Sequence, residues 1–301
     1  MSDHHDSILV TGASGFVGKA LCQELLKRNT HIIPIKFADI AQVNTSVPFR
    51  NCSAVVHLAA RVHVMNDSAT DPLTEFRAVN LEGTLKLARQ AAAAGIKRFV
   101  FISSVKVNGD STLPGRAFTE SDVPNPRDAY GLSKHEAEQG LHRLSADTGM
   151  EVVIIRAPLV YGPGVKANFA ALVGIVQRGW PLPLGAVHNQ RSLVALSNLV
   201  DFIATCIPHP QAVNQTFLIS DGQDLSTTDL VRGIAQALGV SARLLPVPDW
   251  ALQAGASLMG KRDVIQRLCG NLQVDITKAR SLLGWVPPVS VKEGLRLATA
   301  L

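Results

Sequence analysis

Short apolar runs alternate with longer amphipathic segments along the first half of the chain. The runs are rich in β-branched residues, and the segments between them repeat apolar positions every three to four residues. This alternation predicts an α/β fold built on a Rossmann-type, doubly wound parallel sheet. The predicted strands are 7–10, 31–35, 54–58, 98–103 and 151–156, and the predicted helices are 18–28, 71–94 and 129–148.

The pattern loosens after Tyr161, where proline-rich and glycine-rich stretches such as 180–185 appear. Helices are predicted there at 198–206 and 227–238. The segment 35–54 is short for a full helix and strand, so we predict an abbreviated βα unit in it. We predict a dinucleotide-binding domain of residues 1–163 plus about 190–220, and a smaller C-terminal substrate-binding lobe of residues 164–189 plus about 221–301.

Composition narrows the class of protein. The chain has 301 residues, of which 47% are hydrophobic, enough for a buried core. Its four cysteines lie far apart without a C-x-x-C pair, so we expect neither a metal site nor a disulfide framework. The net charge of +5 comes from scattered lysines and arginines, and we expect no nucleic-acid or membrane partner. The first residues lack the features of a signal peptide, which predicts a cytoplasmic location.

Three glycines with G-x-x-G-x-x-G spacing join the first predicted strand to the first helix. Gly12 permits a tight turn, Gly15 lets backbone N–H groups approach a pyrophosphate, and Gly18 allows close packing of helix on strand. The phosphates would then lie at the positive helix N-terminus. The alternative is a βα turn without a ligand. Residues expected to bind a dinucleotide here are Gly12, Ser14, Gly15, Phe16, Val17 and Gly18.

The residue that ends the second strand discriminates between NAD and NADP, because a carboxylate binds the bare ribose and a cation binds the 2′-phosphate. Counting 24 residues on from Gly12 gives Lys36. Asp39 is a rival for the ribose or the adenine, and a solvated loop charge is the alternative for both residues. We therefore expect NAD(P) as cofactor, with NADP(H) slightly favoured over NAD(H).

Tyr130 and Lys134 stand four residues apart at the start of the helix 129–148, so their side chains share one face. The lysine charge and an oxidised nicotinamide are expected to lower the pKa of Tyr130 toward working pH, which would let it give or take a proton. An isolated pair of this spacing also occurs as a packed tyrosine and a solvated lysine. Ser104 follows the strand 98–103, where ligands gather in such sheets, and could hydrogen-bond a substrate oxygen.

Taken together, these motifs resemble the extended short-chain dehydrogenase/reductase superfamily, and within it the NAD-dependent epimerase/dehydratase family of nucleotide-sugar enzymes. The segments that carry the resemblance are 11–18, 57–60, 79–84, 103–104 and 130–134, with later markers at 156–164, 191–194 and 282–287. The resemblance implies a catalytic triad of Ser104, Tyr130 and Lys134. It adds to the cofactor-binding residues Ile40, Leu58, Ala59, Ala60, Asn80, Ser103, Tyr130, Lys134 and Pro158.

The same resemblance implies a nucleotide-sugar substrate. Besides Ser104, it places Asn168 and Arg191 where the substrate diphosphate is held, and an arginine suits that group because its planar fork binds bidentately. Arg267 is a further candidate, with a plain surface arginine as the alternative. A homodimer is also expected, through the helices 71–94 and 129–148.

Two departures from the family pattern bear on the reaction. The sugar dehydratases carry an Asp-Glu pair where this chain has Val105 and Lys106, which leaves water elimination without its acid and base. Leu159 stands where UDP-glucose 4-epimerases have an asparagine. The sequence therefore favours a reductase of the 4-keto group of a UDP- or dTDP-linked deoxy sugar. The alternatives are a UDP-hexose (UDP-glucose or UDP-GlcNAc) 4-epimerase with tightly bound NAD, and a non-catalytic nucleotide-sensing regulator.

Overall fold

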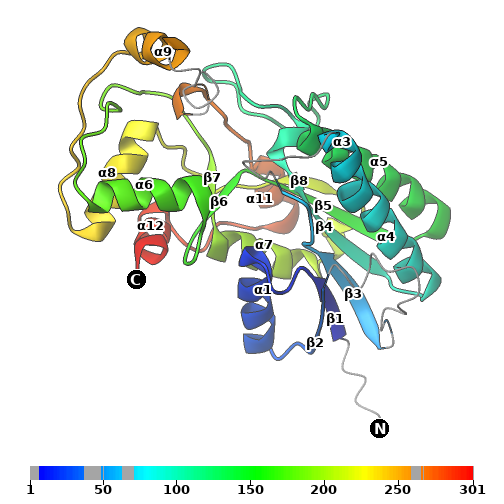
Figure 1. The fold of residues 1–301 in the computed structure, drawn as a ribbon. Helices are drawn as coiled ribbons and strands as arrows, with labels where there is room; N and C mark the ends of the chain where they lie inside the picture. The colour runs from blue at the N-terminus through cyan, green and yellow to red at the C-terminus, as the bar shows by residue number, and fades with distance from the viewer. Residues whose placement is uncertain are drawn as a thin grey trace.

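A six-stranded parallel sheet organises the chain (Figure 1). The computed structural model describes residues 7–36, 49, 51–62, 71–258, 266 and 268–300. The strand order is β2-β1-β3-β4-β5-β8. The chain adds β2 on one side of β1 and β3 with the later strands on the other, as in a doubly wound sheet. The strands are β1 (Ser7–Thr11), β2 (Ile32–Ile35), β3 (Cys52–His57), β4 (Arg98–Ser104), β5 (Glu151–Ala157) and β8 (Thr216–Leu218).

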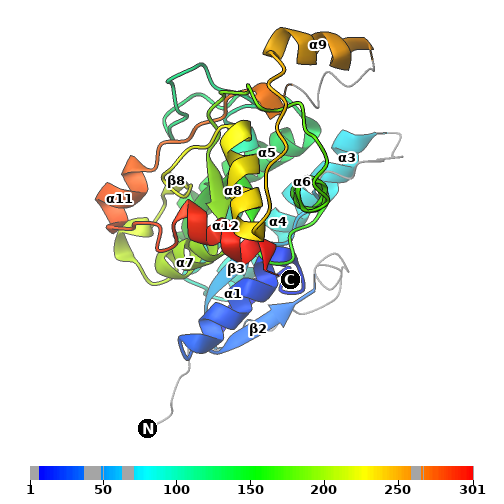
Figure 2. The same cartoon turned by 90° about the vertical axis from the view of Figure 1, so that its left-hand side faces the viewer.

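Helices cover both faces of the sheet, because successive strand residues point to opposite sides. Ile8 and Val10 of β1 join one apolar cluster with α1 (Phe16–Lys27) and α7 (Leu196–Cys206). Leu9, between them, joins a second cluster with α4 (Thr84–Ala93) and α5 (Ala129–Thr148). Figures 1 and 2 show these two helix layers on either side of the strands. The predicted sheet and its helix layers are confirmed.

The predicted single helix 71–94 is interrupted. It begins as α3 (Pro72–Phe76), with the Asp71 carboxylate accepting hydrogen bonds from the backbone N–H groups of Leu73 and Thr74. A π-helical segment, Arg77–Gly83, then leads into α4. A π-helical turn contains one more residue than an α-helical turn, and the spacing of apolar residues does not reveal it. The segment contains Asn80, whose side chain is fully buried.

The C-terminal half contributes a third apolar cluster that includes Tyr161, Phe169, Ile234 and Leu295. A two-stranded parallel pair, β6 (Leu159–Tyr161) and β7 (Leu193–Ala195), lies beside it. Figure 2 shows α8 and α12 next to each other at this side of the molecule. The helices of this half are α6 (Ala167–Gln177), α8 (Thr227–Leu238), α9 (Asp249–Leu258), α11 (Thr277–Leu283) and α12 (Val291–Thr299). The proposed boundaries of the two lobes stay a prediction.

Two short 3₁₀ helices complete the elements, Val105–Val107 directly after β4 and Pro210–Ala212 before β8. In the parts of the chain that the structure describes, no helix has the length and apolarity needed to cross a bilayer. The predicted abbreviated βα unit between residues 35 and 54 falls largely on residues 37–48, which lie outside the described residues.

Candidate active site

The glycine loop between β1 and α1 has the geometry of an anion cradle. Gly12 has φ +69°, a left-handed conformation that favours glycine. A β-carbon on Gly18 would lie 2.1 Å from the Gly12 carbonyl oxygen, so only glycine fits there. Gly15 is the N-cap of α1 and has no side chain to cap the first turn. The backbone N–H groups of that turn can therefore serve a phosphate, as NAD(P) would present.

Two further strand ends meet this loop. Lys36 directly follows β2, and the Gly12 N–H donates to the carbonyl of Ile35 at 3.3 Å. Lys36 therefore follows the residue that contacts Gly12, and its predicted role in binding the ribose or its 2′-phosphate stays a prediction. Ala59 follows β3, and a β-carbon on Gly12 would lie 2.9 Å from its nitrogen. Leu58 and Ala59 thus lie against the Gly12 turn, and the predicted cofactor contacts of Leu58, Ala59 and Ala60 stay predictions.

A buried histidine holds this edge of the sheet together. His57 ends β3, and its ring nitrogens hydrogen-bond the hydroxyls of Thr11 at 2.6 Å and Thr84 at 3.0 Å. Burial, together with the nearby charge of Lys134, lowers the pKa of His57 to about 3. Its ring stacks on Phe101 with centroids 5.9 Å apart. His57 is therefore a neutral structural link between β1, β3 and α4.

Asn80 is a second polar link under the predicted site. Its amide oxygen accepts from the Arg61 N–H at 2.9 Å, and its amide nitrogen donates to the Arg61 carbonyl at 3.1 Å and to the Ser133 hydroxyl at 3.0 Å. This fixes the chain after β3 against α5. Asn80 therefore contributes to the site by positioning, and direct contact with a cofactor stays a prediction.

Ser104, Tyr130 and Lys134 converge at the carboxyl end of β4. Ser104 is the last residue of that strand, and its hydroxyl lies near enough to the Tyr130 phenol to favour the phenolate. Asp128 caps α5 by accepting from the Gly131 N–H at 2.7 Å, which begins the helix just before Tyr130. Lys134 is buried and donates to the Ile102 carbonyl at 2.8 Å. The three residues that the sequence predicts as catalytic are thus brought to one edge.

The lowering of the Tyr130 pKa by Lys134 and an oxidised nicotinamide stays a prediction, and the structure adds that desolvation acts on both side chains. Desolvation raises the pKa of Tyr130 to about 12, against a lowering by the Ser104 hydrogen bond, and the charge of Asp128 raises it further. Desolvation also lowers the pKa of Lys134 to about 7, which Glu138 partly offsets. The i,i+4 spacing of Tyr130 and Lys134 indicates that they share a helix face but carries no information on burial. Burial is the largest cause of the pKa shifts of both side chains.

A buried ion pair lies one turn beyond Lys134. The Glu138 carboxylate accepts bidentately from the Arg156 guanidinium, with Nη2 to Oε2 at 2.6 Å, and also accepts from the Ser103 hydroxyl. Both charged side chains are nearly inaccessible, at 7% and 3% exposed. Arg156 Nη1 also donates to Asn108 Oδ1 at 3.0 Å. The Ser103 side chain, predicted to bind cofactor, is thus committed to an internal bond.

The predicted substrate-side residues are more scattered. Asn168 is exposed in the first turn of α6, and Pro158 is buried between β5 and β6. Arg191 is half-buried, bridges Leu225 and Leu272, and donates to the Gly270 carbonyl at 2.9 Å. Burial lowers the pKa of its guanidinium. Asp39, Ile40 and Arg267 lie outside the described residues, so their predicted roles stay predictions.

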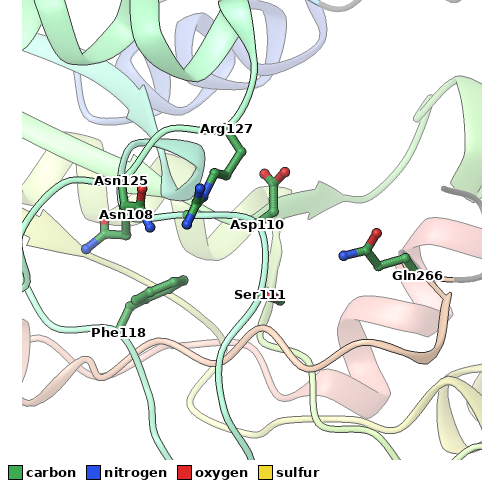
Figure 3. Close-up of a pocket in the computed structure, with 8 residues that line it drawn as sticks. Asn108, Asp110, Ser111, Phe118, Asn125, Arg127 and Gln266 are labelled. Atoms are coloured by element: carbon green, nitrogen blue, oxygen red, sulfur yellow. The ribbon is translucent and has the colours of Figure 1, made fainter.

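A polar pocket of about 430 Å³ opens beside the loop that connects β4 to α5. Figure 3 shows Arg127, Asn108 and Phe118 on one side of it and Gln266 on the other. Asn108 connects the pocket wall to the Arg156–Glu138 pair. Sequence reasoning missed this loop, and it missed Glu138 as well. A carboxylate four residues after Lys134 on the same helix face is the signal that could have identified Glu138.

This geometry, a glycine cradle at one strand end and a Ser-Tyr-Lys group at another, defines a dinucleotide-dependent oxidoreductase site on a Rossmann fold. Residues 8–220 match the model of the NAD dependent epimerase/dehydratase family. The chain belongs to that family, and with it to the extended short-chain dehydrogenase/reductases. The predicted family, fold class and enzyme class are confirmed: the protein is an NAD(P)-dependent enzyme of the nucleotide-sugar group.

Known relatives include a Vibrio cholerae protein described as UDP-glucose 4-epimerase, which is 49% identical over 96% of this chain and 93% of its own length. Among solved structures, RMD from Pseudomonas aeruginosa complexed with NADPH matches with a TM-score of 0.78, 22% identity and coverage of 98% and 97%. UDP-glucuronic acid 4-epimerase from Bacillus cereus in complex with NAD matches with a TM-score of 0.78 and 22% identity, and the match covers 97% of each chain. At this identity the two structures show a shared fold. The Vibrio relative favours the epimerase alternative over the reductase that the sequence put first.

Proposed function

We propose that this protein is a UDP-hexose 4-epimerase that works with a resident NAD. The observation that carries the proposal is the meeting of Ser104, Tyr130 and Lys134 at one sheet edge beside the glycine cradle. Its support comes from the Vibrio cholerae relative, since 49% identity over nearly the whole length spans both the cradle and the C-terminal half. The residues of the site are sufficient for the proton handling that a 4-epimerase needs.

In the proposed reaction Tyr130 would take the proton from the sugar 4-hydroxyl and later return it to the same oxygen, once hydride has returned to the opposite face of carbon 4. Ser104, which lies beside the phenol, would hydrogen-bond the substrate oxygen and hold it in line with Tyr130. When bound, the nicotinamide supplies the hydride acceptor and donor for carbon 4 of the sugar. Lys134, with a pKa of about 7, is the cation available to stabilise the Tyr130 phenolate.

The glycine loop fits a dinucleotide because β-carbons at Gly12 and Gly18 would clash with neighbouring backbone, so only glycines allow the tight turn that leaves the N-terminus of α1 uncapped at Gly15. We assign the remaining contacts by position: Ser14, Phe16 and Val17 to the pyrophosphate, Lys36 to the adenosine ribose. Leu58, Ala59, Ala60 and Pro158 then line the rest. Lys36 supports NADP(H), whereas an epimerase that regenerates its cofactor needs only NAD. Mass spectrometry of the nucleotide that copurifies with the protein decides between them.

For the substrate we assign Asn168 and Arg191 to the diphosphate, because a half-buried guanidinium is a strong partner for that group. We also propose a homodimer through the α4 and α5 faces. These helices pack closely, since a β-carbon on Gly140 would lie 2.7 Å from the Leu85 side chain. A shallow groove runs between them on the outside, lined by Glu82 and Arg89 among others. Sedimentation analysis of the purified protein tests the dimer.

The test of the epimerase is incubation of purified protein with UDP-glucose, and separately with UDP-GlcNAc, without added cofactor. We expect conversion of a gluco-configured sugar to its galacto epimer. The second candidate is the 4-keto reductase, which the lysine at position 36 favours. Incubation with NADPH and a 4-keto-6-deoxy UDP-sugar tests it. Loss of nicotinamide absorbance there, with no epimer in the first assay, would replace the epimerase by the reductase. In either case Tyr130→Phe should abolish turnover and leave the nucleotide bound.

A further inference from the structure

Lys106 bridges two carboxylates next to the predicted catalytic residues. Its ammonium contacts Asp110 Oδ1 at 2.5 Å and Asp128 Oδ2 at 3.2 Å, and its own backbone N–H donates to the Ser104 hydroxyl at 3.2 Å. Asp128 is the N-cap of α5, two residues before Tyr130. One lysine therefore connects the segment that carries Ser104 with the first turn that carries Tyr130.

The backbone around Lys106 is packed as tightly as its side chain is paired. A β-carbon on Gly131 would lie 2.8 Å from the Lys106 carbonyl oxygen, so the 3₁₀ turn after β4 rests directly on the residue that follows Tyr130. The side chains of Lys106, Asp110 and Asp128 are 31–38% exposed. Their charges are therefore partly screened, and the Asp128 charge acts on the phenol.

We propose that Lys106 is a positioning residue that offsets part of the charge of Asp128 beside Tyr130 and so makes the phenolate accessible to the reaction. The assignment rests on the proposed function of Tyr130 as the proton acceptor. Asp128 is needed as the helix cap, but its negative charge opposes ionisation of the phenol. Lys106, whose charge is shared with Asp110, leaves the cap in place and offsets part of that opposition. This gives a physical role to a lysine where the sugar dehydratases carry a carboxylate.

Other charged groups also face Tyr130 and bear on its ionisation. Lys134 follows on the same helix, one turn away. On the side of α3, Phe76 packs edge-on against the Tyr130 ring, with centroids 6.0 Å apart. Arg61 lies over Phe76 and pairs with Glu75 at 3.3 Å. None of these groups is altered by a substitution at Lys106, so the variant isolates the charge of the Lys106 cluster.

The sequence makes a direct measurement feasible because it has only two tyrosines. The other, Tyr161, is fully buried and donates to Asp221 at 2.7 Å, which together hold its pKa far above the usual range. The ultraviolet absorbance of phenolate therefore reports Tyr130, with Tyr130→Phe as the blank. We would measure the ionised fraction at one alkaline pH, on protein saturated with NAD, within the range where circular dichroism shows it folded.

In this assay Lys106→Met should lower the ionised fraction about threefold, which corresponds to a rise of about half a pH unit in the Tyr130 midpoint. Asp128→Asn keeps a good helix cap and should raise the fraction. The ionised fraction of the double variant Lys106→Met/Asp128→Asn should return close to that of the wild type. Lys106→Arg, which keeps the positive charge, should also have the wild-type fraction. A role in packing alone would leave the double variant as low as Lys106→Met.

Three results would overturn the proposal: an unchanged fraction in Lys106→Met, no recovery in the double variant, or no rise in Asp128→Asn. The last decides even if Lys106→Met fails to fold. Because the titration needs no substrate, it also separates this inference from the proposed function. A protein that shows the predicted shifts but turns over no UDP-hexose keeps the positioning role of Lys106 and loses the epimerase.

Discussion

Replacing Glu138 with glutamine should lower the free energy of unfolding by about 3 kcal/mol. The substitution keeps the size of the side chain but removes the charge that pairs bidentately with Arg156 at 2.6–3.3 Å. Both side chains are 7% exposed or less, so water cannot solvate the guanidinium left behind. We take the lower end of the range for a broken buried pair, because glutamine can still hydrogen-bond Ser103 and Arg156.

Urea unfolding followed by circular dichroism measures this loss. The matched control is Glu293→Gln in α12, which breaks another bidentate glutamate–arginine pair whose side chains are 43% and 61% exposed. That variant should unfold at nearly the wild-type midpoint. The double variant Glu138→Gln/Arg156→Met should recover much of the loss, because the unpaired buried charge is then gone.

The reasoning would be refuted if Glu138→Gln were as stable as the Glu293→Gln control, or if removal of Arg156 brought no recovery. Glu138 also raises the pKa of Lys134, so its loss should leave Lys134 less often charged at neutral pH. Activity of Glu138→Gln should therefore fall more at pH 8 than at pH 6. An equal loss of activity at pH 6 and pH 8 would mean that the variant acts through stability and not through the charge of Lys134.

Three further outcomes are expected. Between pH 6.5 and about 3, His57 is protonated in the unfolded chain but stays neutral in the folded chain. The free energy of unfolding should therefore fall on acidification by up to about 1.4 kcal/mol per pH unit. His57→Gln should reduce this dependence in urea unfolding measured at several pH values. Gly18→Ala should abolish dinucleotide binding in calorimetry, whereas Gly174→Ala, where nothing lies within 4 Å, should not. Lys36→Ala should weaken NADP⁺ about tenfold relative to NAD⁺; equal losses would remove Lys36 from the ribose site.

Elements that bury one continuous face were predictable from the sequence. The helix 129–148 is predicted with the bounds that α5 has, and the five predicted strands are present within two residues at either end. β8 was missed because a strand of three residues, Thr216–Leu218, is shorter than any reliable alternation. α6 was missed because it is apolar on nearly every side, which leaves no periodicity to detect.

The candidate site was predictable where a motif fixes backbone geometry and not where burial decides. The spacing of Gly12 and Gly18 implies the tight approach that the structure shows. No spacing could reveal that Lys134 is desolvated, or that Asp128 and Lys106 pair next to Tyr130. Those facts depend on segments distant in sequence that come together in the folded chain. The position of the π-helical turn at Asn80 could not be predicted from residue spacing either.

The most direct test of the central claim uses UDP-glucose labelled with deuterium at carbon 4, incubated with purified protein in ordinary water without added cofactor. The proposed epimerase predicts a galacto-configured product that keeps the deuterium at carbon 4, because the hydrogen removed from the sugar returns to it without exchange with water. Tyr130→Phe should give no product. A product that has lost the label to solvent, or one that forms only when NADPH is supplied, would contradict the proposed function.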